Sequence, residues 1–536
     1  MSKILPSRRY HRVPRPLMSD AYTVNGFTFE TEVALKNSRY YATFRKHPSE
    51  HEPIYASDDK RILFAGLQAL CDILFYDPIT HEEINESLKF LKGRKATSQG
   101  FEDFEFPEAM WRSIVDDYGG YMPLKIEAMP EGSVIYPGEP FLTVSAPDGF
   151  GALVPWFEST LLHVWSASER LTAARHAHQW LYNLIRSVEL PSVSNEQCDF
   201  FARLAIHDFG DRGASCPQES ELVGKMHNLV FFGTDTFRAA YQNWKNGAPA
   251  THGSSVKALA HRVVQAFDNE FDCYQRMYDT ANNNELLSMV GDCYDYANAL
   301  VNKLIPLAIQ SKNDGSGRVI VARPDSGDSY EMIKFTLDTA DKAGLMTTVS
   351  TLRGDMKQST TLRFIAGNGE SYKTVVESTL KLLENGYIPW RCGIFGIGGA
   401  LRNNITRDHM STKFALCEVD SGEDARPVIK LSEEVGKQTL PGVCFPVRDK
   451  SVSDKPFIAH KRDNYKSAFV LYYNGSLEEP FGIGFTETFS AIEKRVMEDF
   501  KEASLTSGGI TKNISDIRDS LISKHCPSFW SKSFSK

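Results

Sequence analysis

One polar string stands out in the sequence, His-Asp-Phe-Gly-Asp-Arg-Gly at residues 207–213. In this string, glycines alternate with an aromatic residue, carboxylates and an arginine. Phe209 beside Arg212 suits a flat aromatic ligand that carries a phosphate, because the ring offers a stacking face and the guanidinium forks onto phosphate oxygens. The alternative is a turn network that satisfies its own hydrogen bonds, and the string alone leaves both interpretations open.

Two glycine-rich strings follow apolar runs later in the chain. Gly-Ile-Gly-Gly at residues 396–399 precedes an expected helix near Leu401, and Gly-Asn-Gly occupies residues 367–369. Glycines let backbone N–H groups approach a phosphate, and a helix N-terminus adds a partial positive charge. Either string alone is equally compatible with a tight turn.

The string Arg-Pro-Asp-Ser-Gly at residues 323–327 places a cation beside a carboxylate. Arg323 can fork onto a phosphate, while Asp325 can accept hydrogen bonds from ribose hydroxyls. The alternative is an internal ion pair between the two. Taken together, these strings require a ligand that combines a phosphate, a ribose and a planar ring.

Bulk composition narrows the class of protein. The chain has 536 residues and a formal net charge of −8, which disfavours broad binding to nucleic acid or a membrane surface, so an anionic substrate needs a local cluster of Arg and Lys. Nine cysteines without C-x-x-C spacing indicate reduced, mostly buried thiols rather than a zinc or redox motif. The basic N-terminal stretch lacks the apolar core of a secretory signal, and the most apolar stretch, 149–165, contains Pro155 and Glu158. We therefore expect a cytoplasmic protein without membrane spans.

The elements that must position these strings begin at about residue 200. Short apolar runs recur there, each followed by a polar or glycine-rich loop and a helical stretch. Six are clear (202–206, 229–232, 286–290, 319–322, 362–366 and 392–395) and two are weak (248–251 and 414–417). Such repeats imply parallel strands with right-handed crossovers, whose following loops gather at one end. The prediction is an α/β fold with an irregular β/α barrel at 191–420; the alternative is an open doubly wound sheet.

The remaining segments, 1–190 and 421–536, are expected to be α+β and to pack together as a second domain. Alternation within 129–146 predicts short antiparallel strands. Further expected elements are helices at 62–75, 160–188 and 488–502, and a strand at 468–473.

The ordered set of motifs resembles that of nicotinamide phosphoribosyltransferases. The set is His-Asp-Phe-Gly-x-Arg-Gly, Gly-Thr-Asp-Thr, Arg-Pro-Asp-Ser-Gly, Gly-x-Gly, Phe-Gly-x-Gly-Gly and Thr-Arg-Asp, with Ser-Asp-Ala-Tyr at 19–22, Phe-Ala-Gly-Leu-Gln at 64–68 and Lys-Leu-Ser at 430–432. The similarity covers roughly residues 15–445. It implies a homodimeric enzyme of the type II phosphoribosyltransferase fold that joins nicotinamide to phosphoribosyl pyrophosphate, giving nicotinamide mononucleotide and pyrophosphate, with Mg²⁺.

The resemblance also implies roles for single residues. Phe209 and Tyr22, the latter from the partner subunit, would stack on the pyridine ring, and Asp235 would accept a hydrogen bond from the carboxamide. Arg323 would lie near ring and phosphate, and Asp325 would hold the ribose. Arg212 and, from the partner subunit, Arg407 would clamp the pyrophosphate. The remaining contacts implied for the phosphates and the ribose are Gly367, Gly398, Gly399, Asn368 (where the family often has Asp), Lys413 and Lys430.

Asp235 separates nicotinamide from nicotinate on physical grounds. A carboxylate can accept from the amide N–H of nicotinamide, whereas it repels the carboxylate of nicotinate by several kcal/mol. Nicotinamide is therefore the favoured base. The alternatives are a nicotinate phosphoribosyltransferase and a non-catalytic nucleotide-binding protein on the same fold.

The family members that couple the reaction to ATP hydrolysis carry a transiently phosphorylated histidine. Here the motif is altered to Ala-Pro-Ala-Thr-His at 248–252, so His252 is the candidate, with Asp292 as the carboxylate that orients it. His252, Asp292 and Asp325 thus form the expected catalytic set. Whether ATP is used stays open, because Thr251 replaces the Glu of the family motif.

Overall fold

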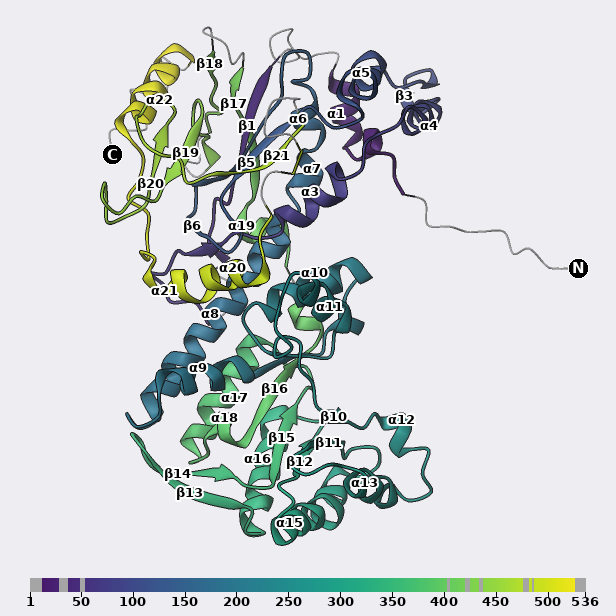
Figure 1. The fold of residues 1–536 in the computed structure, drawn as a ribbon, viewed down its shortest axis with the longest axis vertical. Helices are drawn as coiled ribbons and strands as arrows, with labels where there is room; N and C mark the ends of the chain where they lie inside the picture. The colour runs from purple at the N-terminus through teal and green to yellow at the C-terminus, as the bar shows by residue number, and fades with distance from the viewer. Residues whose placement is uncertain are drawn as a thin grey trace, which may run out of the picture.

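The parts of the chain that the computed structural model describes are residues 12–27, 37–48, 54–402, 405–419, 425–432, 437–475, 482–483 and 486–525. Figure 1 shows two halves stacked along the long axis of the molecule, each built on its own sheet. The upper half combines the early (purple) and late (yellow) parts of the chain, and the lower half contains its middle (teal and green).

The upper half contains a seven-stranded sheet made from both ends of the chain. Its order is β18 (Arg426–Pro427), β17 (Lys413–Val419), β1 (Ser38–Thr43), β7 (Pro140–Ser145), β5 (Lys125–Ala128), β21 (Val470–Asn474) and β22 (Gly482–Ile483), with every pairing antiparallel. Large side chains such as Phe44, Phe141 and Trp156 fill the core beside it. The second α+β domain built from N- and C-terminal segments is therefore present.

The lower half contains a curled parallel sheet. Its order is β10 (Lys257–Ala258), β11 (Leu286–Val290), β12 (Val319–Arg323), β15 (Leu362–Ala366), β16 (Gly393–Ile397), β8 (Ile206–Asp208) and β9 (Gly233–Thr234). The first strand in sequence, β8, pairs with the last, β16, and the ring is open only between β9 and β10, where a single bridge joins Gly233 to Ser254. Pairing of first with last strand is the order of a barrel rather than of a doubly wound sheet, so the predicted irregular β/α barrel is confirmed.

Individual strand predictions differ in accuracy. The runs 286–290 and 362–366 coincide with β11 and β15, because both are apolar strands flanked by breakers. The run 202–206 is mostly helix, since the preceding helix continues to Leu204, and the run 229–232 lies before β9. The run 414–417 is a strand, β17, but it is not one of the barrel strands as expected, because it pairs with β1 in the antiparallel sheet. The expected domain boundary itself falls at residues 420–424, outside the described residues.

The predicted antiparallel strands within 129–146 are β6 (Val134–Ile135) and β7. The helix expected at 62–75 begins only at Leu67, because Ile62 and Leu63 form β2 and Gly66 turns the chain with a φ of 99°. The helix expected at 488–502 is present as α20 (Phe489–Lys494), a π-helical turn (Arg495–Asp499) and α21 (Phe500–Glu502).

The other helices of the antiparallel half are α1 (Ala21–Gly26), α3 (Leu67–Phe75), α4 (His81–Leu91), α5 (Glu108–Tyr118), α6 (Leu153–Trp156), α7 (Glu158–Leu161), α19 (Arg407–Met410) and α22 (Lys512–His525). Those around the parallel sheet are α9 (Asn195–Leu204), α10 (Pro217–Asn228), α11 (Phe237–Lys245), α12 (His261–Val264), α13 (Glu270–Asp279), α14 (Tyr296–Ala299), α15 (Ile305–Asp314), α16 (Ser329–Lys342), α17 (Tyr372–Glu384) and α18 (Pro389–Cys392). Besides β2 with β6, the two-stranded pairs are β3 (Lys95–Thr97) with β4 (Gly100–Glu102), β13 (Met346–Thr351) with β14 (Gly354–Ser359), and β19 (Cys444–Val447) with β20 (Phe457–His460).

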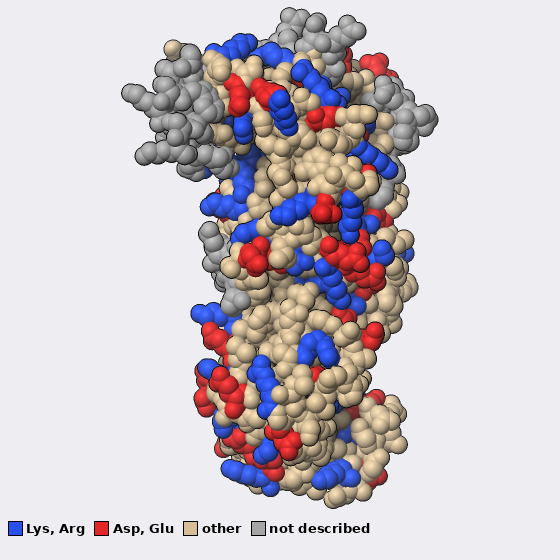
Figure 2. Space-filling model, turned by 90° about the vertical axis from the view of Figure 1, so that its left-hand side faces the viewer, with Lys and Arg blue, Asp and Glu red and all other residues tan. Residues whose placement is uncertain are grey.

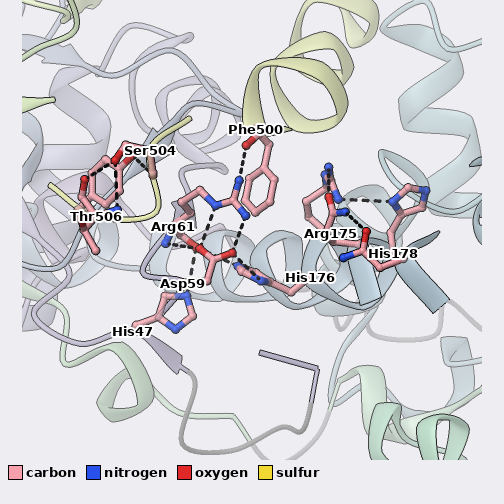
Figure 3. A network of polar contacts seen from close by, with 12 residues as sticks. His47, Asp59, Arg61, Arg175, His176, His178, Phe500, Ser504 and Thr506 are labelled. Atoms are coloured by element: carbon pink, nitrogen blue, oxygen red, sulfur yellow. Dashed lines mark hydrogen bonds and ion pairs between the residues drawn. The ribbon is translucent and has the colours of Figure 1, made fainter. Parts of the chain in front are cut away.

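The helix α8 (Val164–Val188) runs between the two halves and carries the buried polar network shown in Figure 3. On it, His176 contacts the backbone oxygen of Arg61 at 3.1 Å, and Arg175 donates to the backbone oxygen of Val496 at 2.8 Å. Arg61 and Arg175 both lie on the ring of Phe500, with guanidinium carbons 3.9 and 4.5 Å from its centroid. The network therefore fastens the late segment of the chain to the bridging helix.

The surface charges are mixed in sign, and the described thiols are free. On the face shown in Figure 2, Lys and Arg alternate with Asp and Glu over both halves, without a broad basic field. None of the described helices has the length and apolar character needed to cross a bilayer. The eight cysteines in the described ranges are all free thiols, and six of them are buried.

Candidate functional site

A cavity of about 490 Å³ lies at the carboxyl ends of the parallel strands. Loops after five strands line it: Phe209, Asp211, Arg212 and Gly213 after β8, Asp235 and Thr236 after β9, Arg323 and Asp325 at the end of β12, Gly367 after β15, and Gly398 and Gly399 after β16. A second hollow of about 450 Å³ shares Arg212, Asp235, Arg323 and Asp325 with the first and extends along residues 258–262 after β10. The loops therefore converge at one end of the sheet, as parallel strands require.

Phe209 lies where a flat ligand can stack. Its backbone N–H donates to the carbonyl of Ile397 at 2.9 Å, which holds the loop after β8 against β16. Its ring lies directly against Gly396, where a Cβ would overlap the ring, and 3.4 Å from the Cβ position of Gly367. These two glycines thus make room for the aromatic ring beside the strand ends.

Asp235 is oriented by two donors. His207 Nε2 and Ser255 Oγ both donate to its Oδ1, at 3.0 and 2.5 Å, and among the described residues none donates to Oδ2. Burial acts to raise the pKa of this carboxyl, but the hydrogen bonds from His207 and Ser255 lower it overall. Asp235 is therefore an ionised acceptor that is nearly half-exposed toward the cavity, at 47%.

Arg323 supplies a cation that forms no ion pair with any of the described residues. Its Nε is buried and has no hydrogen-bond partner among the described residues, and no ion pair forms there between Arg323 and Asp325. The internal ion pair considered from the sequence is therefore absent. Because a buried guanidinium N–H without a partner is costly, the position suits an anionic or polar ligand in the cavity.

The pairing expected between His252 and Asp292 is not formed. His252 lies buried between the rings of Phe232 and Phe489, and its Nε2 is 2.9 Å from Glu493 Oε1. Asp292 instead lies 3.0 Å from Nε2 of His261, which also approaches Asp325 at 3.8 Å. His261 lines the second hollow, whereas His252 joins the late segment of the chain to the barrel.

The sequence prediction missed His261 because it placed the weak strand at 248–251. The strand is β10, at Lys257–Ala258, so the residues that follow its carboxyl end are Leu259, Ala260 and His261. A signal was present, since Pro249 argues against a strand at 248–251, whereas 255–258 contains Val256 and no proline. The histidine that a parallel strand delivers to the site is the one just after that strand.

Besides His252, Asp292 and Asn368, four further predicted residues lie outside this chain's cavity lining: Tyr22, Arg407, Lys413 and Lys430. Tyr22 is on α1 and is 71% exposed, and the side chain of Arg407, the first residue of α19, is 57% exposed. Burial raises the pKa of Glu158, and the charges of Lys413, Asp20 and Arg407 modify this shift, so each of the three acts on the Glu158 carboxyl. We call Tyr22, Arg407 and Lys413 the outer cluster; it belongs to the antiparallel half. Lys430 is also exposed.

Asn368 connects two loops of the barrel. Its Nδ2 donates to the backbone oxygen of Gly327 at 2.8 Å, so it joins the loops after β15 and β12 and does not line the cavity. The neighbouring Glu370 is buried and accepts from Ser329 and from Thr374, which strengthens the same connection. Sequence reasoning did not single out Glu370.

Comparisons with known proteins agree with this geometry. Residues 204–468 match the nicotinate phosphoribosyltransferase (NAPRTase) family. A nicotinamide phosphoribosyltransferase of Xanthomonas campestris is 28% identical over 431 residues, 77% of this chain and 87% of that protein. A nicotinate phosphoribosyltransferase of Mycobacterium tuberculosis is 32% identical over 225 residues, 41% of this chain and 40% of that protein. The crystal structure of human nicotinic acid phosphoribosyltransferase superposes with a TM-score of 0.56 at 15% identity, covering 95% of this chain and 99% of that one.

Proposed function

We propose that this chain, which matches the nicotinate phosphoribosyltransferase family over residues 204–468, is a pentosyltransferase of NAD salvage. It makes nicotinamide mononucleotide and pyrophosphate from nicotinamide and phosphoribosyl pyrophosphate. The observation that carries the choice of nicotinamide is Asp235, an ionised acceptor held by His207 and Ser255 in the same cavity as Phe209. A cytoplasmic location is part of the proposal, because the described cysteines are free thiols.

The reaction depends more on the positioning of the two substrates than on proton transfer. Attack of the pyridine nitrogen on C1 of the ribose passes through a state with oxocarbenium character, as in glycoside chemistry. The nitrogen is unprotonated near neutral pH, so it needs no general base. Phe209 and Asp235 would fix the ring, Asp325 the ribose, and Gly367, Gly398 and Gly399 the 5′-phosphate. Arg212 and Arg323 would stabilise the departing pyrophosphate.

We propose that Mg²⁺ would bind in this cavity mainly through phosphate oxygens of the substrate. No group of three or more potential metal-ligating side chains occurs among the described residues, but Asp211 and Asp325 line the cavity. Mg²⁺ commonly uses one or two carboxylates, waters and substrate phosphates. When bound, it would neutralise charge on the leaving pyrophosphate.

An assay with nicotinamide and nicotinate, each with and without ATP, tests the proposal directly. Nicotinamide mononucleotide should form only when phosphoribosyl pyrophosphate and Mg²⁺ are both present, and it should form faster than nicotinate mononucleotide. Faster product from nicotinate would favour the second candidate, which the similarity to the M. tuberculosis enzyme supports. Ligand binding without any product would make the chain a non-catalytic binding protein.

If ATP hydrolysis drives the reaction, we expect the phosphoryl group to pass through His261 rather than His252. His261 has a carboxylate partner, Asp292, and opens onto the hollow that contains Arg212, whereas His252 is enclosed by aromatic rings. His261→Ala should abolish the stimulation by ATP and keep the ATP-independent rate. His252→Gln should lower the melting temperature but keep the stimulation. The initial rate with and without ATP separates them, and stimulation that survives in His261→Ala would remove this residue from the pathway.

We also propose that the enzyme is a homodimer in which the outer cluster of one subunit completes the cavity of the other. The support is that Tyr22 and Arg407 are exposed and absent from the cavity of their own chain, although the family resemblance places their counterparts at the substrate. A C2 dimer presents the same patch twice, so both sites would be completed in the same way.

Mixing two inactive variants checks this arrangement. Arg323→Ala damages the cavity and Arg407→Ala damages the contributed cluster, so each homodimer should have little activity. Random exchange makes half of the dimers mixed, with one intact site each, so activity should recover to about a quarter of the wild-type level. A monomer in light scattering, or no recovery after exchange, would contradict the shared site.

A further inference from the structure

A second feature of the site concerns how its loops are held together. Asp208, the last residue of β8, and Arg402, just after the 3₁₀ turn Gly399–Leu401, form a two-pronged ion pair. Arg402 Nη2 donates to Asp208 Oδ2 at 2.9 Å, and Nη1 donates to Oδ1. Both side chains have 0% exposure, so the pair is enclosed by protein.

The pair connects three of the loops that line the cavity. Asp208 directly precedes Phe209, and its Oδ1 also accepts from the backbone N–H of Gly210 at 2.8 Å. Its Oδ2 accepts from the hydroxyl of Thr234 at 3.0 Å, and Thr234 Oγ1 in turn accepts from the N–H of Thr236 at 2.9 Å. Arg402 lies three residues after Gly399. The Asp208 carboxylate therefore connects the loop that carries Phe209, the loop that carries Asp235 and the loop that contains Gly398 and Gly399.

Side-chain packing cannot fix the relative position of the loops at this junction. The loops after β8 and β16 meet through glycines, and a Cβ on Gly213 would stand 2.6 Å from the Cα of Gly399. A Cβ on Gly210 would meet Arg402 itself and stand 2.7 Å from the oxygen of Gly398. Backbones in such close contact have no interlocking side chains, so the relative position of the loops depends on polar bonds across them.

We propose that Arg402 is a positioning residue. Through Asp208 it fixes three parts of the site relative to one another: the ring of Phe209, the carboxylate of Asp235, and the loop of Gly398 and Gly399. It does not touch the substrate. The inference rests on the proposed phosphoribosyl transfer, because it concerns the spacing of the groups that would bind base and sugar phosphate. A bound near-attack geometry is sensitive to displacements of about 1 Å, so loosening this pair should affect turnover as well as stability.

Arg402→Lys is the sharpest test, because it keeps the charge and removes the fork. We expect KM for nicotinamide and for phosphoribosyl pyrophosphate to rise together and kcat/KM to fall by about 100-fold. Arg61→Lys is the matched control, since Arg61 forms a similarly buried two-pronged pair with Asp59 away from the cavity (Figure 3). It should lose thermal stability and keep both KM values.

Thr234→Val provides a second variant in case Arg402→Lys does not fold. It removes one bond to Asp208 with little change of shape, and it should raise KM for nicotinamide more than KM for phosphoribosyl pyrophosphate, because Thr234 leads to Asp235. Isothermal titration with nicotinamide mononucleotide gives a parallel readout as a change in Kd.

The outcomes separate the two proposals. A folded Arg402→Lys with wild-type KM values and Kd, or, if it does not fold, a Thr234→Val with wild-type values, would overturn the positioning role. An inactive wild-type enzyme would overturn the proposed function instead, and the Kd comparison would still decide the role of Arg402.

Discussion

Asp235→Ser is expected to reverse the choice of base. The serine hydroxyl removes the ionised acceptor for the carboxamide, and a hydrogen bond to a charged group is worth about 1.5–3 kcal/mol, so kcat/KM for nicotinamide should fall by roughly 10- to 100-fold. The same change removes a like charge that faces the carboxylate of nicotinate, a repulsion of several kcal/mol, so turnover of nicotinate should rise. Steady-state kinetics with the two bases under identical conditions measures both effects.

Asp211→Ser is the control for total charge. Asp211 also lines the cavity, but it accepts from Ser220 and Arg238 and lies on the loop after β8. This variant carries the same net charge as Asp235→Ser and should still prefer nicotinamide. If Asp235→Ser keeps the wild-type ratio of kcat/KM values for the two bases, the carboxylate does not select the substrate. The selectivity must then come from other residues of the cavity.

Acidification below neutral pH is expected to destabilise the junction between the two halves strongly. His47, His176 and His178 are buried in and beside the network of Figure 3, and burial lowers the pKa of each to about 4. The groups that face them include the charged Arg61, Arg175 and Lys60, which disfavour protonation, and Asp59 and Asp199, which favour it. The net effect keeps these imidazoles neutral in the folded chain.

The direction of the pH effect follows from proton binding. An unfolded histidine has a pKa near 6.5, so between pH 6.5 and 4 the unfolded chain binds more protons than the folded chain. Stability is therefore fully present above pH 6.5 and falls as the pH decreases through this window. Each histidine contributes a loss of about 3 kcal/mol near pH 4, which is large beside the 5–15 kcal/mol typical of a whole domain.

Urea denaturation at a series of pH values between 7.5 and 4.5 measures this loss. The midpoint should decrease steadily below pH 6.5, and His47→Gln should flatten the decrease by removing one of the titrating groups. His81→Gln is the control, because His81 is exposed and 44% of its side chain is accessible. A midpoint that stays constant from pH 7 to pH 5 would show that these histidines are solvated in the folded chain.

The sequence alone reached the fold class and most of the cavity lining for physical reasons. Phe209, Arg212, Asp235, Arg323, Asp325, Gly367, Gly398 and Gly399 all line the cavity, because each follows or ends a strand of a parallel sheet whose loops share one end. The apolar runs that predicted β11 and β15 are short and bounded by breakers, so their limits are visible in the sequence.

Contacts between segments that are far apart in the chain could not be predicted from the sequence. The run 414–417 has the pattern of a strand, but a strand pattern does not name its partner, and only the fold places β17 beside β1. Likewise His252 and His261 are both histidines near a weak strand, and only the position of β10 decides which one meets Asp292. The same holds for the outer cluster, because in the proposed dimer its residues would reach a cavity only in a second subunit.

The types and order of the chemical groups were thus determined by the sequence, since local patterns set which residues stand at strand ends. Tertiary structure alone decided which of those groups touch, as in the pair of Asp208 with Arg402, 194 residues apart. The physical reason is that contacts between distant segments are selected by the packing of the whole chain, whereas strands and turns are encoded by neighbours in sequence.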